Sequence, residues 1–446
     1  MSTDGRVGWL GLATVWFGGV ISVSALLVGA TLIKGLAFGG VLLWGGLGFL
    51  VVGACMALLG ARAAEHDVGT GVLAARAFGT QGARLVLGIV VGVPLMGWFG
   101  VQTEIAAGSV VRIVTLSFGQ QWPFAVVTLV LGATMTLTAV VGFGALKWLN
   151  YVAVPCKVAL VVYGVGRVLL EHGIAPILAW RPEPANALDP LTAIGLAAGF
   201  VAVAAVIAPD YARHARTSRD AVLGCLLGLV PASIVLAGCG AVLAIAQNTH
   251  DIVEIYAGMG LPLLALAMLV VATWTTNVMN VYSAGLALAG LVGSEKRGLA
   301  TAIAGLLGSV LAVLGILGKL IGFLSLLTAT VLPIAGVMIA AWWLVPRPDD
   351  EQRGWSVTGL VAWATGVATV LCVNHPVRDL LGPVVAGLVF TLLSRRTVRS
   401  AVVEGCTGRR ADSPSLSETQ RGRAPRASPQ LLSMDQTLKA DCQRPV

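Results

Sequence analysis

The chain has 446 residues, of which 57% are hydrophobic and 11% are charged, and its formal net charge is +8. A soluble domain has about 25% charged residues, so this composition excludes an ordinary soluble protein and predicts an all-α polytopic membrane protein. The net positive charge fits basic loops and a basic tail better than nucleic-acid binding. The seven cysteines contain no C-x-x-C pair, which argues against a metal site or a disulfide framework.

Apolar runs long enough to cross a membrane recur along the chain and predict about twelve transmembrane helices. Their expected limits are 8–33, 36–60, 84–112, 123–146, 150–170, 188–208, 219–246, 261–291, 298–318, 320–345, 355–373 and 379–394. The first run starts near Val7 and is too long for the apolar part of a signal peptide, so we expect no cleavable signal. If the number of spans is even and the N-terminus is inside, most Lys and Arg residues of the loops lie on the cytoplasmic side of the membrane. This predicts a multi-pass protein of the cytoplasmic (inner) membrane with both termini in the cytoplasm.

Two spans are unusually rich in small residues. The first contains Gly18, Gly19 and Ser22, and the sixth contains Gly195 and Gly199. Small residues either interrupt a helix or let two helices pack closely, and close packing is the alternative for each span alone. We predict interruption, because broken helices at corresponding positions of two inverted repeats mark the binding site of many transporters.

This hypothesis divides the chain into four parts. The expected parts are a first inverted repeat at 1–170, a second at 188–345, two additional helices at 355–394 and a disordered cytoplasmic tail at 400–446. The tail is rich in Ser, Arg and Pro and has no long apolar run, which is typical of disorder.

The third span carries polar groups at depths where lipid offers no partner. Trp98 and Gln102 are four residues apart and share one helix face, whereas Glu104 points elsewhere. Such groups are costly in a membrane unless they face a cavity or a polar partner. We therefore predict that the Trp98 face lines a small-molecule site, with packing and interhelical hydrogen bonding as the alternative. Glu104 either faces an external vestibule, which we favour, or takes part in proton coupling.

Charged residues follow the sixth span directly. Asp210 and Arg213 are three residues apart and could pair on one helix face. A charge cluster is expected at any cytoplasmic helix end, so we interpret this one as a structural or gating element.

The eighth span holds a second group of polar residues, between Ala272 and Ser283. Thr275 and Thr276 offer hydroxyl oxygens to a cation, together with carbonyl groups that an interrupted first helix would free. Asn280 follows Thr276 by four residues and lies on nearly the same face. We predict a ligand site here, with interhelical hydrogen bonds as the alternative.

Three motifs resemble the nucleobase:cation symporter-1 family, in particular its bacterial cytosine permeases. They are Gly97-Trp98-Phe99-Gly100-Val101, Asp210-Tyr211-Ala212-Arg213 and Trp274-Thr275-Thr276-Asn277. The similarity runs in order from about Leu12 to Arg396. It implies a LeuT-type fold of two inverted five-helix repeats followed by two C-terminal helices.

The resemblance also implies a substrate site. An aromatic residue at the Trp98 position stacks on the planar ligand, and the second stacking position falls at Val201, with Phe200 adjacent. A flat ring is best held between ring faces, with a few hydrogen bonds at its edge. Gln102 matches a polar partner in the hydantoin-transporting branch, and Gln102 and Asn280 would read the edge of the ring.

The resemblance places a cation between the first and eighth helices. Thr275 and Thr276 match the hydroxyl ligands of a sodium ion, and the carbonyls around Gly18 and Ser22 match their partners on the first helix. One position departs from the cytosine permeases: they have Asn three residues before the first of these threonines, where this chain has Ala272, as in the hydantoin branch. This departure leaves the identity of the heterocycle open.

The expected function is a secondary-active symporter that imports a nucleobase, cytosine or another purine or pyrimidine, by alternating access and coupled to Na⁺ or H⁺. The alternatives are a transporter for a related heterocycle (hydantoin, allantoin or hydroxymethylpyrimidine) and an uncoupled uniporter. An enzyme is not expected, because the five histidines fall at loops or span ends and neither HExxH nor GxSxG occurs.

We expect no cofactor and no metal apart from the coupling ion. The expected partners are a small planar heterocycle and membrane lipid, without nucleic acid. The sequence leaves the oligomeric state open, and a monomer is compatible with it.

Overall fold

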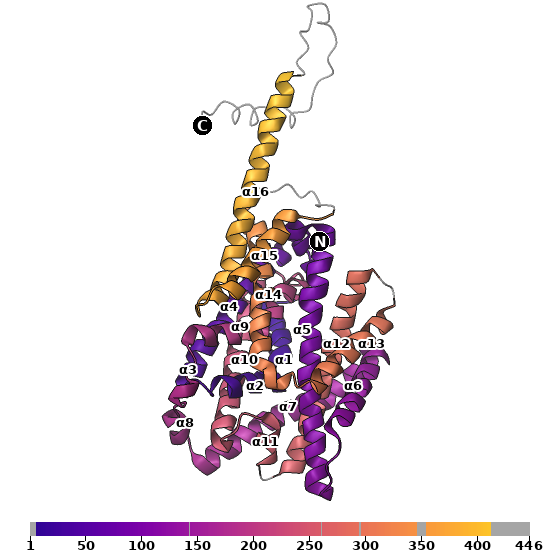
Figure 1. Cartoon of the computed structure of the whole chain (residues 1–446), viewed down its shortest axis with the longest axis vertical. Helices are drawn as coiled ribbons and strands as arrows, with labels where there is room; N and C mark the ends of the chain where they lie inside the picture. Colours follow the sequence, from indigo (N-terminus) through magenta and orange to yellow (C-terminus); the bar gives the residue numbers. More distant parts are fainter. Residues whose placement is uncertain (1–5, 142, 260, 294–295, 346–353, 412–446) are drawn as a thin grey trace, which may run out of the picture. The chain divides into compact units, whose positions relative to one another are not determined.

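The computed structural model describes residues 6–141, 143–259, 261–293, 296–345 and 354–411 of the chain (Figure 1). Over these ranges the regular secondary structure is helical, and the extended pairing consists of one isolated parallel bridge between Val7 and Ala215. The chain divides into two compact units, Met1–Thr391 and Leu392–Val446. Helices α1 to α15 belong to the first unit. This architecture confirms the predicted all-helical fold.

The helices follow the predicted spans. Their bounds are α1 Trp9–Val20, α2 Val23–Leu32, α3 Phe38–Gly40, η1 Val41–Gly45, α4 Gly46–His66, α5 Thr70–Phe118, α6 Phe124–Val141, α7 Phe143–His172, α8 Ala175–Ala179, η2 Pro184–Asn186, α9 Pro190–Ala212, α10 Ser218–Gln247, α11 Ile252–Ala257, α12 Pro262–Val292, α13 Arg297–Val313, η3 Leu317–Lys319, α14 Leu320–Trp343, α15 Val357–Cys372 and α16 Arg378–Ala411. Seven described helices are long and apolar enough to cross a membrane, and the bent pair α1–α2 would make an eighth span.

The first span is interrupted, as its small residues predict. α1 ends at Val20, α2 begins at Val23, and the two helices are bent by 68°. Ser22, between them, has an extended backbone with φ −148° and ψ 158°. The last carbonyls of one helix and the first N–H groups of the next lack intrahelical partners. The break therefore places free main-chain polar groups near the middle of the span.

The predicted interruption of the sixth span is wrong. α9 is one continuous helix from Pro190 to Ala212. Its glycines permit close packing instead: a Cβ at Gly199 would collide with the carbonyl of Leu324 and with the hydroxyl of Thr328, both on α14. A Cβ at Gly195 would collide with the carboxylate of Asp379. Small-residue packing, the alternative interpretation, is the correct one for this span.

α5 and α12 carry the two predicted groups of polar residues and pack against each other (Figure 1). α5 is kinked at Gly79, whose φ of 75° is a left-handed conformation that favours glycine. On α12, the amide nitrogen of Asn277 donates hydrogen bonds to the Phe99 carbonyl at 3.1 Å and to the Thr103 hydroxyl at 2.8 Å, both on α5. Since Asn277 is completely buried, these bonds fix the register of the two helices.

The predicted pair between Asp210 and Arg213 does not form. The carboxylate of Asp210 accepts a hydrogen bond from the backbone N–H of Thr70, at 2.8 Å, and so satisfies a free donor at the start of α5. The guanidinium of Arg213 donates to His214 instead, at 3.2 Å. Asp210 thus joins α9 to α5, which is a structural role.

The predicted tail begins inside a helix. α16 runs from Arg378 to Ala411, so residues 400–411, which we assigned to the disordered tail, are helical. Residues 412–446 lie outside the described residues. The inverted-repeat boundaries at 1–170 and 188–345 stay a prediction.

Candidate functional site

An aromatic cluster joins three membrane helices, α5, α9 and α14. Trp98 of α5 is 7% exposed, and its ring centroid is 5.5 Å from that of Phe200 on α9 and 5.3 Å from that of Phe323 on α14. The interplanar angles are 79° and 74°, so both phenyl rings meet the indole edge to face. Trp98 and Phe200, the two side chains predicted to stack on a ligand, are therefore in contact with each other. Their role toward a ligand stays a prediction.

Phe323 reaches the indole because the residue before Trp98 is a glycine. A Cβ at Gly97 would lie 2.6 Å from Cζ of Phe323 and closer still to Cε2. A larger residue at this position would push the phenyl ring away from Trp98. The glycine of the Gly97-Trp98 motif thus admits a third ring to the cluster.

Gln102 lies one turn after Trp98 on the same face of α5. Its side chain is 1% exposed, and its Oε1 accepts no hydrogen bond from the described residues. A buried polar atom without a partner is rare in folded proteins and calls for an explanation. Asn280 of α12 is partly buried, and it too has no hydrogen-bond partner among the described residues. Val201, the predicted second stacking position, is buried in the apolar core. The Gln102 oxygen is thus free to accept an N–H from a bound molecule.

The predicted cation site contains an ammonium group. The hydroxyls of Thr275 and Thr276 both lie within hydrogen-bonding distance of the Ala272 carbonyl, at 3.2 Å and 3.5 Å. Lys157, near the middle of α7, donates a hydrogen bond from Nζ to the Thr276 hydroxyl at 2.8 Å. Within the described ranges, no carboxylate forms an ion pair with Lys157. A hydroxyl assigned to a sodium ion therefore already accepts a hydrogen bond from a cationic side chain.

The residues predicted to contribute carbonyls lie on either side of the helix break. Gly18 is in the last turn of α1 and is exposed, whereas Ser22 directly precedes α2 and is 8% exposed. α12 contacts both α2 and α7. α12 therefore contacts the second half of the broken helix and the helix that carries Lys157.

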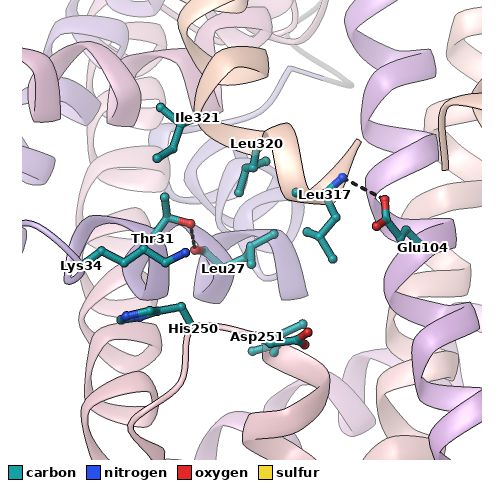
Figure 2. A pocket seen from close by; sticks show the side chains of 11 residues that line it. Leu27, Thr31, Lys34, Glu104, His250, Asp251, Leu317, Leu320 and Ile321 are labelled. Carbon is teal, nitrogen blue, oxygen red and sulfur yellow. Dashed lines mark hydrogen bonds between the residues drawn. The ribbon is translucent and has the colours of Figure 1, made fainter. Parts of the chain in front are cut away.

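Glu104 lines a cavity of about 330 Å³ that Trp98 does not line (Figure 2). Its Oε2 accepts a hydrogen bond from the backbone N–H of Leu317 at 2.8 Å. Lys34, His250 and Asp251 also line this cavity. Burial and the positive charge of Lys34 lower the pKa of His250. The choice between an external vestibule and proton coupling for Glu104 stays a prediction.

Comparison with known proteins identifies the family. Residues 5–390 match the model of a family described as permeases for cytosine/purines, uracil, thiamine and allantoin. The chain belongs to this family, the nucleobase:cation symporter-1 family. It is therefore a transporter and not an enzyme.

Individual relatives cover most of this permease. It is 29% identical to the cytosine permease of Escherichia coli (strain K12) over 402 residues, which are 88% of this chain and 93% of the relative. It is 25% identical to the hydantoin permease of Microbacterium maritypicum over 424 residues, 87% of this chain and 84% of the relative. A solved structure of Mhp1 in an inward-facing conformation matches with a TM-score of 0.78 at 20% identity, covering 89% of this chain and 92% of that one. The structural match confirms the LeuT-type fold.

The sequence interpretation of this permease missed three residues near the site. Lys157 lies inside the predicted fifth span, 150–170, and an ionisable residue within a span is itself a sign of function. Phe323 lies among apolar residues of the tenth span, and no pattern marks it. Asn277 belongs to a recognised motif, yet its bonds to α5 depend on how two helices meet in space.

Proposed function

We propose that this permease is a secondary-active symporter that imports a nucleobase or a related planar heterocycle by alternating access. The heterocycle lies against Trp98 and Phe200, and its edge is bound by Gln102 and Asn280. The driving ion is Na⁺ or H⁺. The protein resides in the cytoplasmic membrane with both termini in the cytoplasm, as the distribution of Lys and Arg favours.

The unpartnered Gln102 oxygen beside the aromatic cluster carries this proposal. Trp98 and Phe200 meet at nearly a right angle, and the proposal places a flat ring against one of these aromatic faces with its edge toward the other. Gln102 follows Trp98 by one helical turn and offers a buried acceptor to a ring N–H. An aromatic surface with few directed polar groups is the usual composition of a site for a small heterocycle.

The relatives support the substrate class without singling out one compound. They include a cytosine permease at 29% identity, and a putative allantoin permease and a hydantoin permease at 25% each. The compounds in these names are small rings that carry N–H donors and carbonyl acceptors. Ala272 stands where the cytosine permeases have Asn, which favours testing hydantoin and allantoin beside cytosine.

The helix break supports transport over simple binding. Interrupted helices in transporters supply main-chain groups to substrate and ion near the middle of the membrane. Here the break at Ile21–Ser22 lies near the middle of its span, as Trp98 does in α5 and Phe200 in α9. Ligand binding near a hinge of this kind can shift the balance between outward-open and inward-open states.

The proposal is tested by thermal melting of the purified protein with a panel of ligands. The panel holds cytosine, uracil, purines, hydantoins, allantoin and hydroxymethylpyrimidine. A ligand that binds the folded state raises the melting temperature according to its saturation. We expect at least one heterocycle to do so for the wild type and not for Trp98→Ala.

The matched control is Trp355→Ala, which removes a tryptophan that is 53% exposed before α15. This variant should respond to ligands as the wild type does. A cooperative melting curve without a response to any panel member would contradict the proposed substrate class. An equal response of Trp98→Ala and wild type would contradict the proposed site.

A further inference from the structure

Lys157 places a positive charge in the middle of a predicted span. It lies near the centre of α7, which runs from Phe143 to His172, and its side chain is partly buried. A charged group at this depth is costly in lipid, so it usually faces the interior of the bundle and marks an ion or substrate pathway. The hydrogen bond to Thr276 shows that Lys157 faces α12. The charge therefore points toward the helix predicted to bind the coupling ion.

The partner of this ammonium is a neutral hydroxyl. Lys157 Nζ lies 2.8 Å from the Thr276 oxygen, while the ion pairs among the described side chains involve other residues. A buried charge is stable only with oxygen atoms or an opposite charge around it. Threonine hydroxyls and carbonyls freed by a broken helix are the oxygens that this fold would offer to a sodium ion.

A sodium ion and the lysine compete for the same oxygen. Each carries one positive charge and binds oxygen lone pairs. The Thr276 hydroxyl is oriented toward the Ala272 carbonyl and accepts from Lys157. Two cations sharing one hydroxyl would repel each other strongly, because the dielectric constant inside the bundle is low. The residues present therefore do not fit a sodium ion at Thr276.

We propose that the ammonium group of Lys157 takes the place of a sodium ion at Thr276. Because the lysine is part of the chain, no metal ion has to be drawn from solution to occupy this position. Heterocycle binding then needs no Na⁺, and Na⁺ is not the coupling ion. The inference rests on the proposed function where it concerns the heterocycle, whereas the competition for the hydroxyl does not depend on it.

The direct test compares the purified wild type in NaCl and in KCl at equal ionic strength. Two quantities are measured: the melting temperature without ligand, and the Kd of the panel heterocycle that gives the largest shift. We expect the same melting temperature and the same Kd in both salts. A higher melting temperature in NaCl, or an affinity about tenfold tighter in NaCl, would overturn the proposal.

Lys157→Met removes the charge and keeps a long, unbranched side chain. We expect its heterocycle affinity in KCl to fall by about tenfold or more and to recover in NaCl, because Na⁺ can then bind the vacated hydroxyl oxygen. The control Lys319→Met removes an exposed lysine and should match the wild type in both salts. If Lys157→Met binds as the wild type does in KCl, the ammonium has no such role and the proposal fails.

Lys157→Arg keeps the charge and covers the case in which Lys157→Met does not fold. We expect this variant to bind the heterocycle independently of Na⁺, and dependence on Na⁺ would overturn the proposal. Failure of the proposed function gives a different result: no heterocycle binds in either salt. The melting temperatures of the ligand-free wild type in NaCl and KCl then still show whether Lys157 takes the place of a sodium ion at Thr276.

Discussion

The first and sixth predicted spans carry the same kind of small residues, yet only the first is broken. Gly18 and Gly19 of α1 have no other atoms within 4 Å of the place where a Cβ would lie. In α9, by contrast, Gly195 and Gly199 face atoms of neighbouring helices that leave no room for a Cβ. Glycine therefore has two uses here: it accompanies a bend in α1–α2 and a close helix contact in α9.

The difference determines what each span offers to the site. The break between α1 and α2 provides main-chain groups, because helix ends leave carbonyl and N–H groups without partners. The continuous helix α9 instead holds a side chain, Phe200, at a fixed place beside Trp98. The first span thus provides a bend, and the sixth provides a continuous helix that holds Phe200 in place.

The largest expected effect is on stability, and it separates the two kinds of glycine. Gly199→Ala would force a Cβ against Leu324 and Thr328, so we expect the free energy of unfolding to fall by about 3 kcal/mol. Gly19→Ala has open space, so its effect should stay within about 1 kcal/mol and be favourable to the helix. Thermal melting of the two purified variants gives the comparison. Equal melting temperatures would show that packing does not explain the glycines of α9.

The next effect is on ligand affinity and tests α9 as a wall of the site. Phe200→Ala removes one ring of the aromatic cluster. The heterocycle should then bind about tenfold more weakly, which is a loss of about 1.4 kcal/mol of binding free energy. Phe17→Ala, on the broken helix, removes a ring that is 50% exposed and should leave the Kd unchanged. Titration of the best panel heterocycle measures both. Unchanged affinity in Phe200→Ala would remove α9 from the site.

A smaller effect tests how α9 is held against α14. The hydroxyl of Thr328 donates a hydrogen bond to the Gly195 carbonyl at 2.7 Å, and Thr328→Val should lower stability by about 1 kcal/mol. Thr330→Val is the matched control, because its hydroxyl donates to the Leu326 carbonyl of its own helix at 2.8 Å. The control should change the melting temperature little. A larger loss in Thr330→Val than in Thr328→Val would contradict the described contact between α9 and α14.

The smallest effect concerns the break itself. The Ser22 side chain makes no capping hydrogen bond to α2, so Ser22→Ala should change stability by less than about 0.5 kcal/mol. Heterocycle affinity should also stay the same, because the break contributes main-chain groups. Melting and titration of this variant check both expectations. A marked loss of binding would assign the role to the hydroxyl in place of the backbone.

The overall fold could be predicted from the sequence because apolar runs and glycines act locally. The positions of the spans, the break near Ser22 and the polar face of Trp98 and Gln102 all follow from short stretches of chain. Whether α9 is broken or continuous could not be predicted, since glycines such as Gly195 and Gly199 can either interrupt a helix or let a neighbouring helix pack closely. Those neighbours come from α14 and α16, more than a hundred residues away in the chain.

The polar side of the site was less predictable than the aromatic side. The aromatic position of Trp98 is recognisable from its own motif. The threonines could be singled out, but what faces them could not, because Lys157 comes from another helix and its contact with Thr276 joins residues 119 positions apart. Likewise Phe323 reaches Trp98 only because Gly97 leaves space for its ring.

The most direct test of the central claim is uptake of radiolabelled heterocycles into proteoliposomes. Cytosine, hydantoin and allantoin would be compared for the wild type, Trp98→Ala and the control Trp355→Ala. The site proposed beside Trp98 predicts saturable uptake of at least one compound by the wild type and by Trp355→Ala, with little uptake by Trp98→Ala. Equal uptake by all three proteins, or none by correctly folded wild type, would contradict it.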